Sequence, residues 1–330
     1  MRILLTHSPD MLASYYGERA LAALRTHGAV VLNETGRVLD DPAALAHAAA
    51  GAQVIVADRQ TPVPGTMLAA CPELLAVCRV AVDIRNIDVA AAGAHGILVT
   101  QATPGFVPAV AELVLGFMID LARGITTASL DYRAGREPPA RMGRQLAGSV
   151  LGVIGYGAIG RRLAELGGAL GMAVLVSDPH QAAQGLRHVS LPELLAEADF
   201  VVCLAVATEA TENLMDEAAF AAMKRGAFFI NPSRGNLVNE AALEAALTRG
   251  HLGGAAMDVG RAPDQKPSPG LAARADVIAT PHVGGLTPQA AEHQAFDTVA
   301  QVAALAAGHM PAGAVNATDA YRFRRAHWLG

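Results

Sequence analysis

Aromatic residues and cysteines are scarce in this chain. Its 330 residues include one Trp, five Tyr, eight Phe and three Cys, although 52% of them are hydrophobic. The interior must therefore be filled mainly by Ala, Val, Leu and Ile. Cys71, Cys78 and Cys203 stand in apolar surroundings without the spacing of metal ligands. We therefore expect buried thiols in a reducing compartment and no metal site.

A strong charge of one sign is also missing. The formal net charge is −5, and the 17% of charged residues carry both signs interspersed along the chain. Without a basic stripe, nucleic acid is not an expected partner. No uncharged apolar stretch reaches the ~18 residues that span a bilayer, so a membrane is not expected either. The apolar run in residues 1–6 is too short for a signal peptide, which predicts a buried first strand and a cytoplasmic protein.

What the chain does contain is a regular alternation of two kinds of segment. Short runs of Val, Ile and Leu alternate with Ala- and Leu-rich helical stretches, which indicates an α/β fold with doubly wound parallel sheets. A length of 330 residues fits two such domains. The first series of expected strands is Ile3–Thr6, Ala29–Leu32, Val54–Ala57, Leu74–Val80 and Ile97–Val99. The second series is Val150–Ile154, Ala173–Val176, Phe200–Leu204, Ala227–Ile230, Ala255–Met257 and Val277–Ala279.

Helices are expected between these strands. Ala13–Thr26 reads as one helix, and Pro42–Ala50 as another with Asp41 as its N-cap. The stretch 110–123 is apolar on nearly every face, so another surface must cover it, for which a partner subunit is the candidate. A polar loop is expected to follow over Tyr132–Arg144, and a late helix over Pro288–Gly308.

Only the second series carries a glycine fingerprint. The strand Val150–Ile154 runs into Gly155, Gly157 and Gly160, the pattern G-x-G-x-x-G. An amphipathic stretch follows, and then a second apolar run that ends at Asp178, 18 residues after the last glycine. This strand–helix–strand–acid order is typical of a dinucleotide site, with the pyrophosphate at the helix N-terminus. Asp178 can accept hydrogen bonds from both ribose hydroxyls and would repel a 2′-phosphate, so we expect NAD as the cofactor.

Three later strands end in residues that suit chemistry on a carbonyl. Arg234 follows Ala227–Ile230 and could hold a substrate carboxylate with its planar fork, unless it is an ordinary surface arginine. Asp258 follows Ala255–Met257 and could either accept from the nicotinamide amide or cap a turn. His282 follows Val277–Ala279 and precedes two glycines, and imidazole is the natural proton donor near neutral pH.

With these motifs in order, the chain resembles the NAD-dependent D-isomer-specific 2-hydroxyacid dehydrogenases over nearly its full length. The matching stretches are Asn86–Asp88 with Gly96–Ile97, Val110–Glu112, Gly155–Gly160 with Asp178, Asn231–Gly235, Asn239–Leu243, Asp258–Val259 and Thr280–His282.

The resemblance implies two domains, a homodimer and a set of site residues. A flavodoxin-like substrate domain would comprise residues 1–102 and 288–330, and a Rossmann-type NAD domain residues 103–287, with the 110–123 helix as the dimer contact. It implies hydride transfer between NAD(H) and a small 2-oxo or 2-hydroxy acid, with Arg234 as carboxylate anchor and His282 as acid/base. The expected substrate-binding residues are Ala81, Val82, Arg85 and Arg234. The expected cofactor-binding residues are Gly155, Gly157, Ala158, Ile159, Gly160, Asp178, Thr208, Pro232, Ser233, Arg234, Asp258, His282, Gly284 and Gly285.

One departure from the family concerns the partner of His282. The family carries a catalytic glutamate five residues after Asp258, and this chain has Pro263 there. Asp264, the next residue, is our candidate for the third catalytic group; the alternative is a solvated loop residue. Without a carboxylate partner, the imidazolium form of His282 loses a stabilising charge. A formate-dehydrogenase-like oxidation would need no such pair, but that variant usually has glutamine at this position. The remaining alternative is an NAD-sensing regulatory protein with weak turnover.

Arg85, near the substrate loop, also leaves two interpretations. It could bind a second acidic group on a substrate, or it could be a solvated loop arginine. The sequence names neither the 2-hydroxy acid nor a role for the last dozen residues, 319–330.

Overall fold

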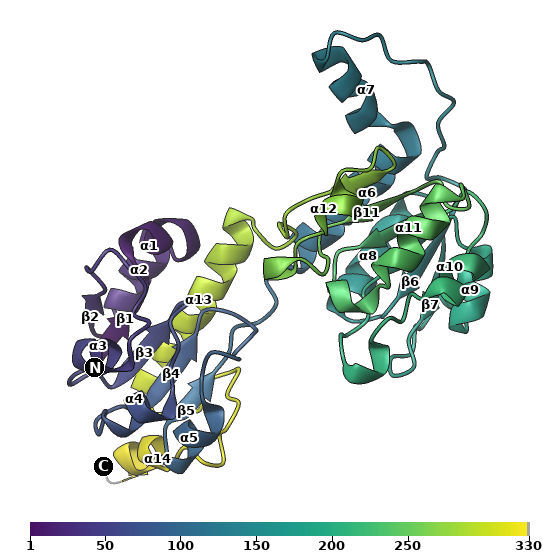
Figure 1. Cartoon of the computed structure of the whole chain (residues 1–330). Coiled ribbons are helices and arrows are strands. Elements are labelled where there is room, and N and C mark those ends of the chain that lie inside the picture. The colour runs from purple at the N-terminus through teal and green to yellow at the C-terminus, as the bar shows by residue number, and fades with distance from the viewer. Residues whose placement is uncertain (329–330) are drawn as a thin grey trace. The chain divides into compact units, whose positions relative to one another are not determined.

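The computed structural model describes residues 1–328 and divides the chain into two domains (Figure 1). The first domain comprises Met1–Phe106 and Thr287–Gly330, and the second comprises Val107–Leu286. Residues 329 and 330, the end of the tail without a predicted role, lie outside the described part. Within it, no helix combines the length and the apolar character that a bilayer crossing requires. The cytoplasmic location stays a prediction.

The first domain is built on a five-stranded parallel sheet of order β2-β1-β3-β4-β5. That is the flavodoxin-like order: β2 lies on one side of β1, and β3, β4 and β5 follow on the other side, so the switch point lies between β1 and β3. Its strands are β1 (Arg2–Leu5), β2 (Ala29–Leu32), β3 (Val54–Ala57), β4 (Ala76–Arg79) and β5 (Leu98–Thr100). Its helices are α1 (Pro9–Tyr15), α2 (Glu18–Arg25), α3 (Pro42–Ala48), α4 (Gly65–Ala69), α5 (Val89–Ala94), α13 (Pro288–Ala306) and α14 (Tyr321–Trp328).

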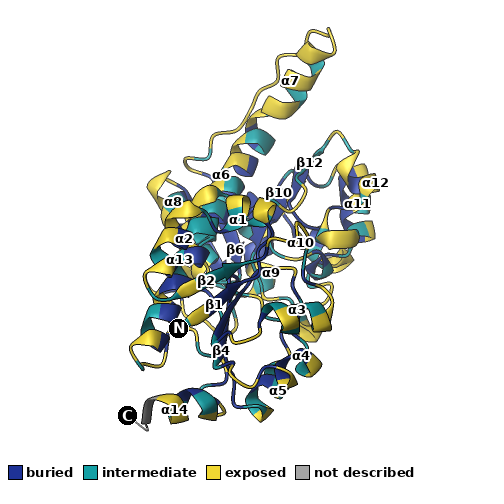
Figure 2. Ribbon diagram, turned by 90° about the vertical axis from the view of Figure 1, so that its left-hand side faces the viewer, coloured by how far each residue is buried: buried dark blue, intermediate teal, exposed yellow. Residues whose placement is uncertain are grey.

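Alternate residues of these strands face opposite layers of helices. Ile3 and Leu5 pack with α2 and α13 on one face, whereas Leu4 packs with α3, α4 and α5 on the other. Both faces of the sheet are shielded from solvent, since the central strands β3 and β4 are buried along their length (Figure 2). This explains why the strands read as continuous apolar runs rather than as alternating ones.

The second domain has a seven-stranded parallel sheet of order β12-β11-β10-β9-β6-β7-β8. Its strands are β6 (Val150–Ile154), β7 (Ala173–Ser177), β8 (Arg187–His188), β9 (Phe200–Cys203), β10 (Phe228–Asn231), β11 (Gly254–Met257) and β12 (Val277–Ala279). Its α-helices are α6 (Val107–Arg123), α7 (Ile125–Arg133), α8 (Ala158–Ala169), α9 (Leu191–Glu197), α10 (Glu217–Ala222), α11 (Glu240–Thr248) and α12 (Pro269–Ala272). Three short 3₁₀ turns complete it among the described residues: η1 (Glu209–Thr211), η2 (Gly235–Leu237) and η3 (Pro263–Gln265).

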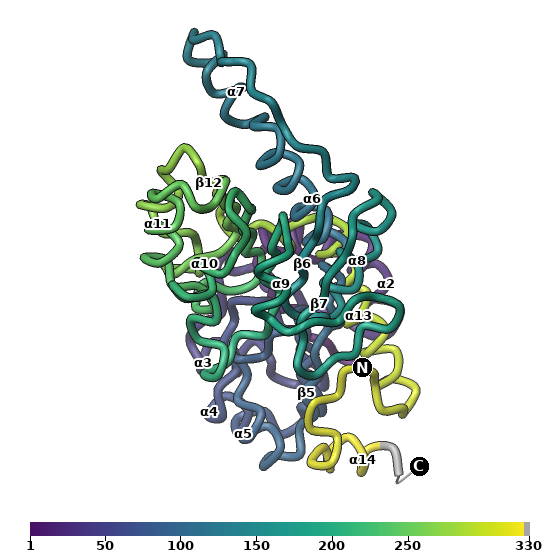
Figure 3. The backbone as a smooth tube through the Cα atoms, turned by 90° about the vertical axis from the view of Figure 1, so that its right-hand side faces the viewer, coloured from purple at the N-terminus to yellow at the C-terminus, as the bar shows by residue number. Residues whose placement is uncertain are grey.

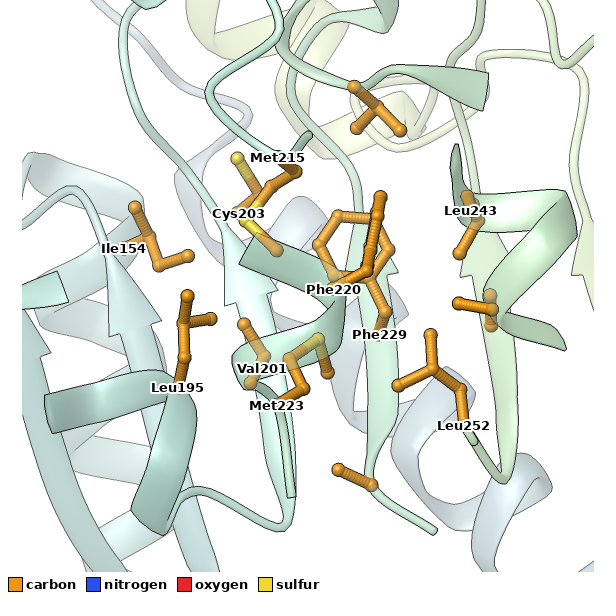
Figure 4. Close-up of a cluster of buried hydrophobic side chains, with 14 of the residues drawn as sticks. Ile154, Leu195, Val201, Cys203, Met215, Phe220, Met223, Phe229, Leu243 and Leu252 are labelled. Atoms are coloured by element: carbon orange, nitrogen blue, oxygen red, sulfur yellow. The ribbon is translucent and has the colours of Figure 1, made fainter. Parts of the chain in front are cut away.

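This strand order is that of a Rossmann domain, with the switch point between β6 and β9. Helices α6 and α8 cover one face of the sheet, and α9 to α12 cover the other. On the latter face Phe220 meets Phe229 edge to face at 5.1 Å, amid aliphatic side chains (Figure 4). The predicted class, two doubly wound parallel-sheet domains, is confirmed.

Several predicted elements need correction. The single helix expected over Ala13–Thr26 is wrong, because the chain forms α1 and α2 separated by Gly17 at φ +83°. That backbone conformation cannot continue a helix, and glycine reaches it without strain. The polar loop expected from Tyr132 begins later, since α7 runs to Arg133. By contrast, Asp41 caps α3 as predicted, accepting from the N–H groups of Ala43 and Ala44.

Helix α7 and the chain after it stand away from the rest of the second domain (Figure 3). Although α6 was expected to be apolar all round, it buries Val114, Phe117 and Met118 within its own domain. One large hydrophobic side chain of α6, Ile119, is exposed. The other exposed ones in this region lie on and after α7: Ile125, Leu130, Tyr132 and Met142.

The C-terminal tail is fastened to the first domain. The ring of Tyr321 lies against Gly96, where a Cβ atom would approach it to 2.5 Å. Arg322 donates to the main-chain oxygens of Cys71 and Leu74. The tail arginine therefore anchors α14 over the loop before β4.

Candidate active site

The glycine turn after β6 has room for a ligand at one position only. A Cβ atom on Gly155 (φ +92°) would lie 2.6 Å from the backbone of Leu204, and one on Gly160 would lie 2.3 Å from the oxygen of Gly155. These two glycines permit the chain's own close packing. A Cβ atom on Gly157 would meet nothing within 4 Å, so its absence leaves space for a ligand to approach the backbone.

The N-terminus of α8 is open to that ligand. Gly157 is its N-cap, and no side chain accepts from the first turn. The N–H groups of Ala158 and Ile159 therefore lack intrahelical partners, as in any first turn, and carry the positive end of the helix dipole. The residues present fit a pyrophosphate at this turn.

Asp178, at the end of β7, faces the same turn. Its carboxylate accepts the N–H of Tyr156 at 2.6 Å, of His180 at 2.7 Å and of Gln181 at 2.9 Å. Partial burial opposes ionisation, but these three donors outweigh it and hold the pKa of Asp178 below its ordinary value. The carboxylate is therefore a fixed negative charge, with one acceptor site left, on Oδ2, for a ribose hydroxyl.

The turn after β10 presents Arg234 to solvent. The buried Asn231 holds this turn, since its side chain donates to the oxygen of Arg234 and accepts from the N–H of Ser233. Ser233 in turn donates to Ala205 in the loop after β9, while Pro232 is buried. Within residues 1–328, the one hydrogen bond of the Arg234 guanidinium is to the main-chain oxygen of Ser233, at 2.8 Å. It is exposed, and four of its five N–H donors remain free for a carboxylate.

Thr208, expected at the cofactor, lies after β9 and caps η1. Its N–H donates to Thr211 Oγ1 at 2.8 Å, and the two hydroxyls lie 3.1 Å apart. The side chain is exposed, and its contact with a cofactor stays a prediction.

Asp258, after β11, organises the turn that carries His282. The buried carboxylate accepts from the Thr280 hydroxyl at 2.6 Å and from the N–H groups of Val283 and Gly284 at 2.8 and 2.9 Å. Its main-chain oxygen accepts the N–H of His282 at 2.9 Å. Of the two roles considered for Asp258, these contacts favour the turn cap; an added contact with nicotinamide stays a prediction. Gly284 has no space for a side chain, because a Cβ atom would lie 2.9 Å from Asp258 Oδ2.

His282 is exposed, and its main chain is left-handed at φ +59°. Its Nδ1 lies 3.2 Å from the main-chain oxygen of Asp264. The predicted pair between the Asp264 carboxylate and the imidazole is not formed. Asp264 has φ +59°, which turns its side chain outward, where it is 83% exposed and 3.7 Å from Lys266 Nζ. We therefore correct the hypothesis: the main chain of Asp264, not its carboxylate, contacts His282.

The substrate residues expected in the first domain lie in the loop after β4. Ala81 is buried and Val82 is half-buried. Arg85 is exposed, and its guanidinium forms a two-point contact with the Asp83 carboxylate at 2.6 and 2.8 Å. This pairing lowers the pKa of Asp83. A second acidic group on a substrate would have to displace Asp83 from Arg85.

Sequence reasoning missed a buried polar cluster at the carboxyl end of the first domain's sheet. Arg79 ends β4 and is 4% exposed; its Nε donates to Asp83 and its Nη2 to Arg59, both through main-chain oxygens. Its Nη1 and the Nδ1 of His7 have no partner among the described residues. Burial lowers the pKa of His7 to about 4, against the opposing charge of Asp58. The signal available was an arginine directly after a buried apolar run.

Residues 1–328 contain no group of three His, Cys, Asp or Glu side chains that could hold a metal ion. Cys71, Cys78 and Cys203 are buried free thiols. The polar residues described above, by contrast, gather at strand ends of each domain. In the second domain they all follow the carboxyl ends of parallel strands, which meet at one edge of a sheet.

Comparison with known proteins agrees with this geometry. Residues 115–284 match the family model for the NAD binding domain of D-isomer specific 2-hydroxyacid dehydrogenases. The chain is 36% identical to the (S)-sulfolactate dehydrogenase of Chromohalobacter salexigens over 302 residues, 89% of this chain and 97% of that protein.

Two further comparisons differ in how much of the other protein they cover and in what they show. The chain is 35% identical to D-3-phosphoglycerate dehydrogenase of Mycobacterium tuberculosis over 80% of its own length, but spans only 51% of that protein. The structure of D-lactate dehydrogenase from Escherichia coli superposes with a TM-score of 0.78 over 96% of this chain and 100% of that one. At 24% identity, this last likeness shows the fold alone.

Proposed function

The chain belongs to the D-isomer specific 2-hydroxyacid dehydrogenase family and is an NAD-dependent enzyme of that class, and we propose that it interconverts a small 2-oxo acid and its D-2-hydroxy acid. The observation that carries this proposal is the shared strand edge of the second domain. The open glycine turn follows β6, Arg234 follows β10, and the Asp258-capped turn with His282 follows β11 and β12.

In the reducing direction, Arg234 holds the substrate carboxylate through its planar fork and polarises the adjacent carbonyl. The glycine turn and Asp178 would hold NADH, which when bound would provide the hydride that reduces the carbonyl carbon. His282 donates a proton to the carbonyl oxygen as the alcohol forms, and takes it back in the oxidising direction. Asp258 keeps the His282 turn in place during both.

The proposed substrate class is a small 2-oxo acid, for which Ala81, Val82 and Arg85 are proposed contacts. Two relatives are named for substrates with a second acidic group, a sulfonate in one and a phosphate in the other. Arg85 is the candidate to receive such a group, in exchange for Asp83.

We also propose a homodimer in which a second copy of the chain covers α6 and α7. The exposed Leu130 and Tyr132 on α7 support this, because exposed apolar side chains that gather on one surface are typical of a protein interface. Light scattering after gel filtration should give a dimer for the wild type and a larger monomer fraction for Leu130→Lys.

The function is tested by steady-state assays with NADH and a panel of 2-oxo acids, with and without a second acidic group. We expect turnover on at least one of them and loss of turnover in His282→Ala. An NAD-sensing regulatory protein would instead bind NADH tightly and turn over none of the panel. Turnover that survives His282→Ala would remove His282 from the acid/base role.

A further inference from the structure

The ring of His282 contacts the main chain of Asp264. Nδ1 lies 3.2 Å from the main-chain oxygen of Asp264. A carbonyl oxygen can only accept, so Nδ1 must carry the hydrogen of this bond. In neutral imidazole the other nitrogen, Nε2, is then without hydrogen and free to take a proton.

The carbonyl is presented by an unusual turn. Asp264 and Gln265 are consecutive non-glycine residues in the left-handed region, at φ +59° and +56°. Such residues need support from their surroundings. The turn is closed by two main-chain bonds, from Gly260 N–H to Gln265 O at 2.9 Å and from Ala262 N–H to Lys266 O at 3.1 Å.

Arg261 fastens the same loop to the body of the second domain. Its N–H donates to Glu240 Oε1 at 3.0 Å, at the start of α11. Its side chain donates to the oxygen of Val238 at 3.0 Å and to Asn213 Oδ1 at 2.6 Å. Glu240 also accepts from Ser268 at the far end of the loop. The loop 260–268 is therefore held at both ends.

The loop also abuts the turn that carries Arg234. A Cβ atom on Gly235 would lie 2.0 Å from the oxygen of Gly260. The turn after β10 and the loop that orients His282 are thus packed backbone against backbone. A shift of one would move the other.

Among the described residues, the charged groups on the turns next to His282 contact groups other than its ring. The Asp258 carboxylate is taken by Thr280 and two N–H groups, and that of Asp264 lies toward Lys266. Arg234 contacts the oxygen of Ser233, and Arg261 pairs with Glu212 at 2.8 Å. Within residues 1–328, no carboxylate lies within ion-pair distance of the His282 ring.

We propose that the main-chain carbonyl of Asp264 is the positioning group for His282, in the place that a glutamate carboxylate fills in the family. The proposal rests on the proposed acid/base function of His282. The carbonyl fixes the ring and its tautomer as a carboxylate would, but it carries no net charge. It therefore stabilises imidazolium less than a carboxylate would.

The tautomer provides a test that does not depend on activity. In the neutral enzyme, ¹⁵N NMR of His282, assigned by comparison with His282→Gln, should show hydrogen on Nδ1 and none on Nε2. Hydrogen on Nε2 would overturn the proposal. If the tautomer is as expected but His282→Gln retains turnover, the positioning holds and the acid/base function fails.

Substitutions separate the carbonyl from the carboxylate. Asp264→Asn keeps a residue that tolerates the left-handed conformation, whereas Asp264→Val does not. Asp264→Val should therefore lower kcat/KM about tenfold more than Asp264→Asn does. Equal losses in the two variants would mean that the carboxylate, not the backbone, is responsible.

The pH profile tests the missing charge. Pro263→Glu restores a carboxylate at the family's position and should move the basic limb of the reductive kcat/KM profile upward by about one pH unit. Asp264→Asn should leave the midpoint of that limb in place. A downward shift of the limb in Asp264→Asn would assign the partner role to its carboxylate and contradict the proposal.

Discussion

The carboxylate of Asp178 accepts a 2.6 Å hydrogen bond from the backbone N–H of Tyr156, the residue between the first two glycines of the fingerprint. This bond ties the acid at the end of β7 to the turn after β6. The negative charge therefore has a fixed place beside the glycine turn, which the open space at Gly157 leaves accessible.

That fixed charge predicts a preference for NAD(H) over NADP(H) of about tenfold or more, since ~1.4 kcal/mol of repulsion corresponds to a factor of ten. In Asp178→Ala, the dissociation constants of NADH and NADPH, measured by fluorescence titration, should lie closer together than in the wild type. Glu165→Gln, a change of an exposed acid on α8, should keep the wild-type ratio. Equal or tighter binding of NADPH by the wild type would refute the assignment.

Arg234→Lys keeps the positive charge and removes the planar fork. Because a lysine cannot bind a carboxylate at two points, kcat/KM for the 2-oxo acid should fall by about tenfold to a hundredfold. The matched control is Arg225→Lys, an exposed arginine of the same domain, which should behave as the wild type. Near-normal kcat/KM in Arg234→Lys would place the anchor elsewhere, with Arg85 the first candidate.

Gly235→Ala tests the contact between the Arg234 turn and the loop after β11. The new Cβ atom would lie 2.0 Å from the oxygen of Gly260, so one backbone must move. We expect a loss of about 1–3 kcal/mol in the free energy of unfolding, together with reduced kcat. Gly168→Ala, in an exposed part of α8 with nothing within 4 Å, should be neutral or stabilising. Urea unfolding that is unchanged in Gly235→Ala would contradict the packing.

His7 makes the first domain sensitive to mild acid. Its pKa is about 4 in the folded protein and 6.5 ordinarily, so only the unfolded chain binds a proton between these values. The contribution of neutral His7 to the free energy of unfolding is therefore fully present above pH 6.5. It is lost as the pH drops toward 4, and the total loss is about 3 kcal/mol.

His7→Gln should remove most of that slope. The measurement is the free energy of unfolding in urea at several pH values from 7.5 to 4.5. His309→Gln, a change of an exposed histidine in the same domain, serves as the control and should keep the slope. A wild-type slope in His7→Gln would mean that other groups account for the acid sensitivity.

Sequence patterns predicted those features in which residue type and spacing carry the signal. The runs of Val and Ile located the strands to within a few residues, because both faces of a parallel sheet are dry. The glycine spacing predicted the turn after β6, where Gly155 and Gly160 have no space for a Cβ atom. Asp178 could be predicted as a cofactor contact because an acid at the end of the second strand is part of the strand–helix–strand–acid order of a dinucleotide site.

Features made by the main chain escaped prediction. Any residue has a carbonyl, so nothing in the sequence marks the oxygen of Asp264 as the neighbour of His282. The left-handed conformation of Asp264 turned the expected carboxylate outward. Neither Asp264 nor Gln265 is a glycine or an asparagine, the residues that most often indicate this conformation in a sequence. Helix α7 was missed because its apolar side chains are not covered by its own domain.

The most direct test of the central claim follows the hydride itself. The wild-type enzyme is supplied with NADH that carries deuterium at both C4 positions and with a 2-oxo acid that it turns over, and the product is examined by NMR and chiral chromatography. We predict a D-2-hydroxy acid with deuterium at C2, formed by the wild type and absent with His282→Ala. An L-2-hydroxy acid, or a product without deuterium at C2, would contradict the account.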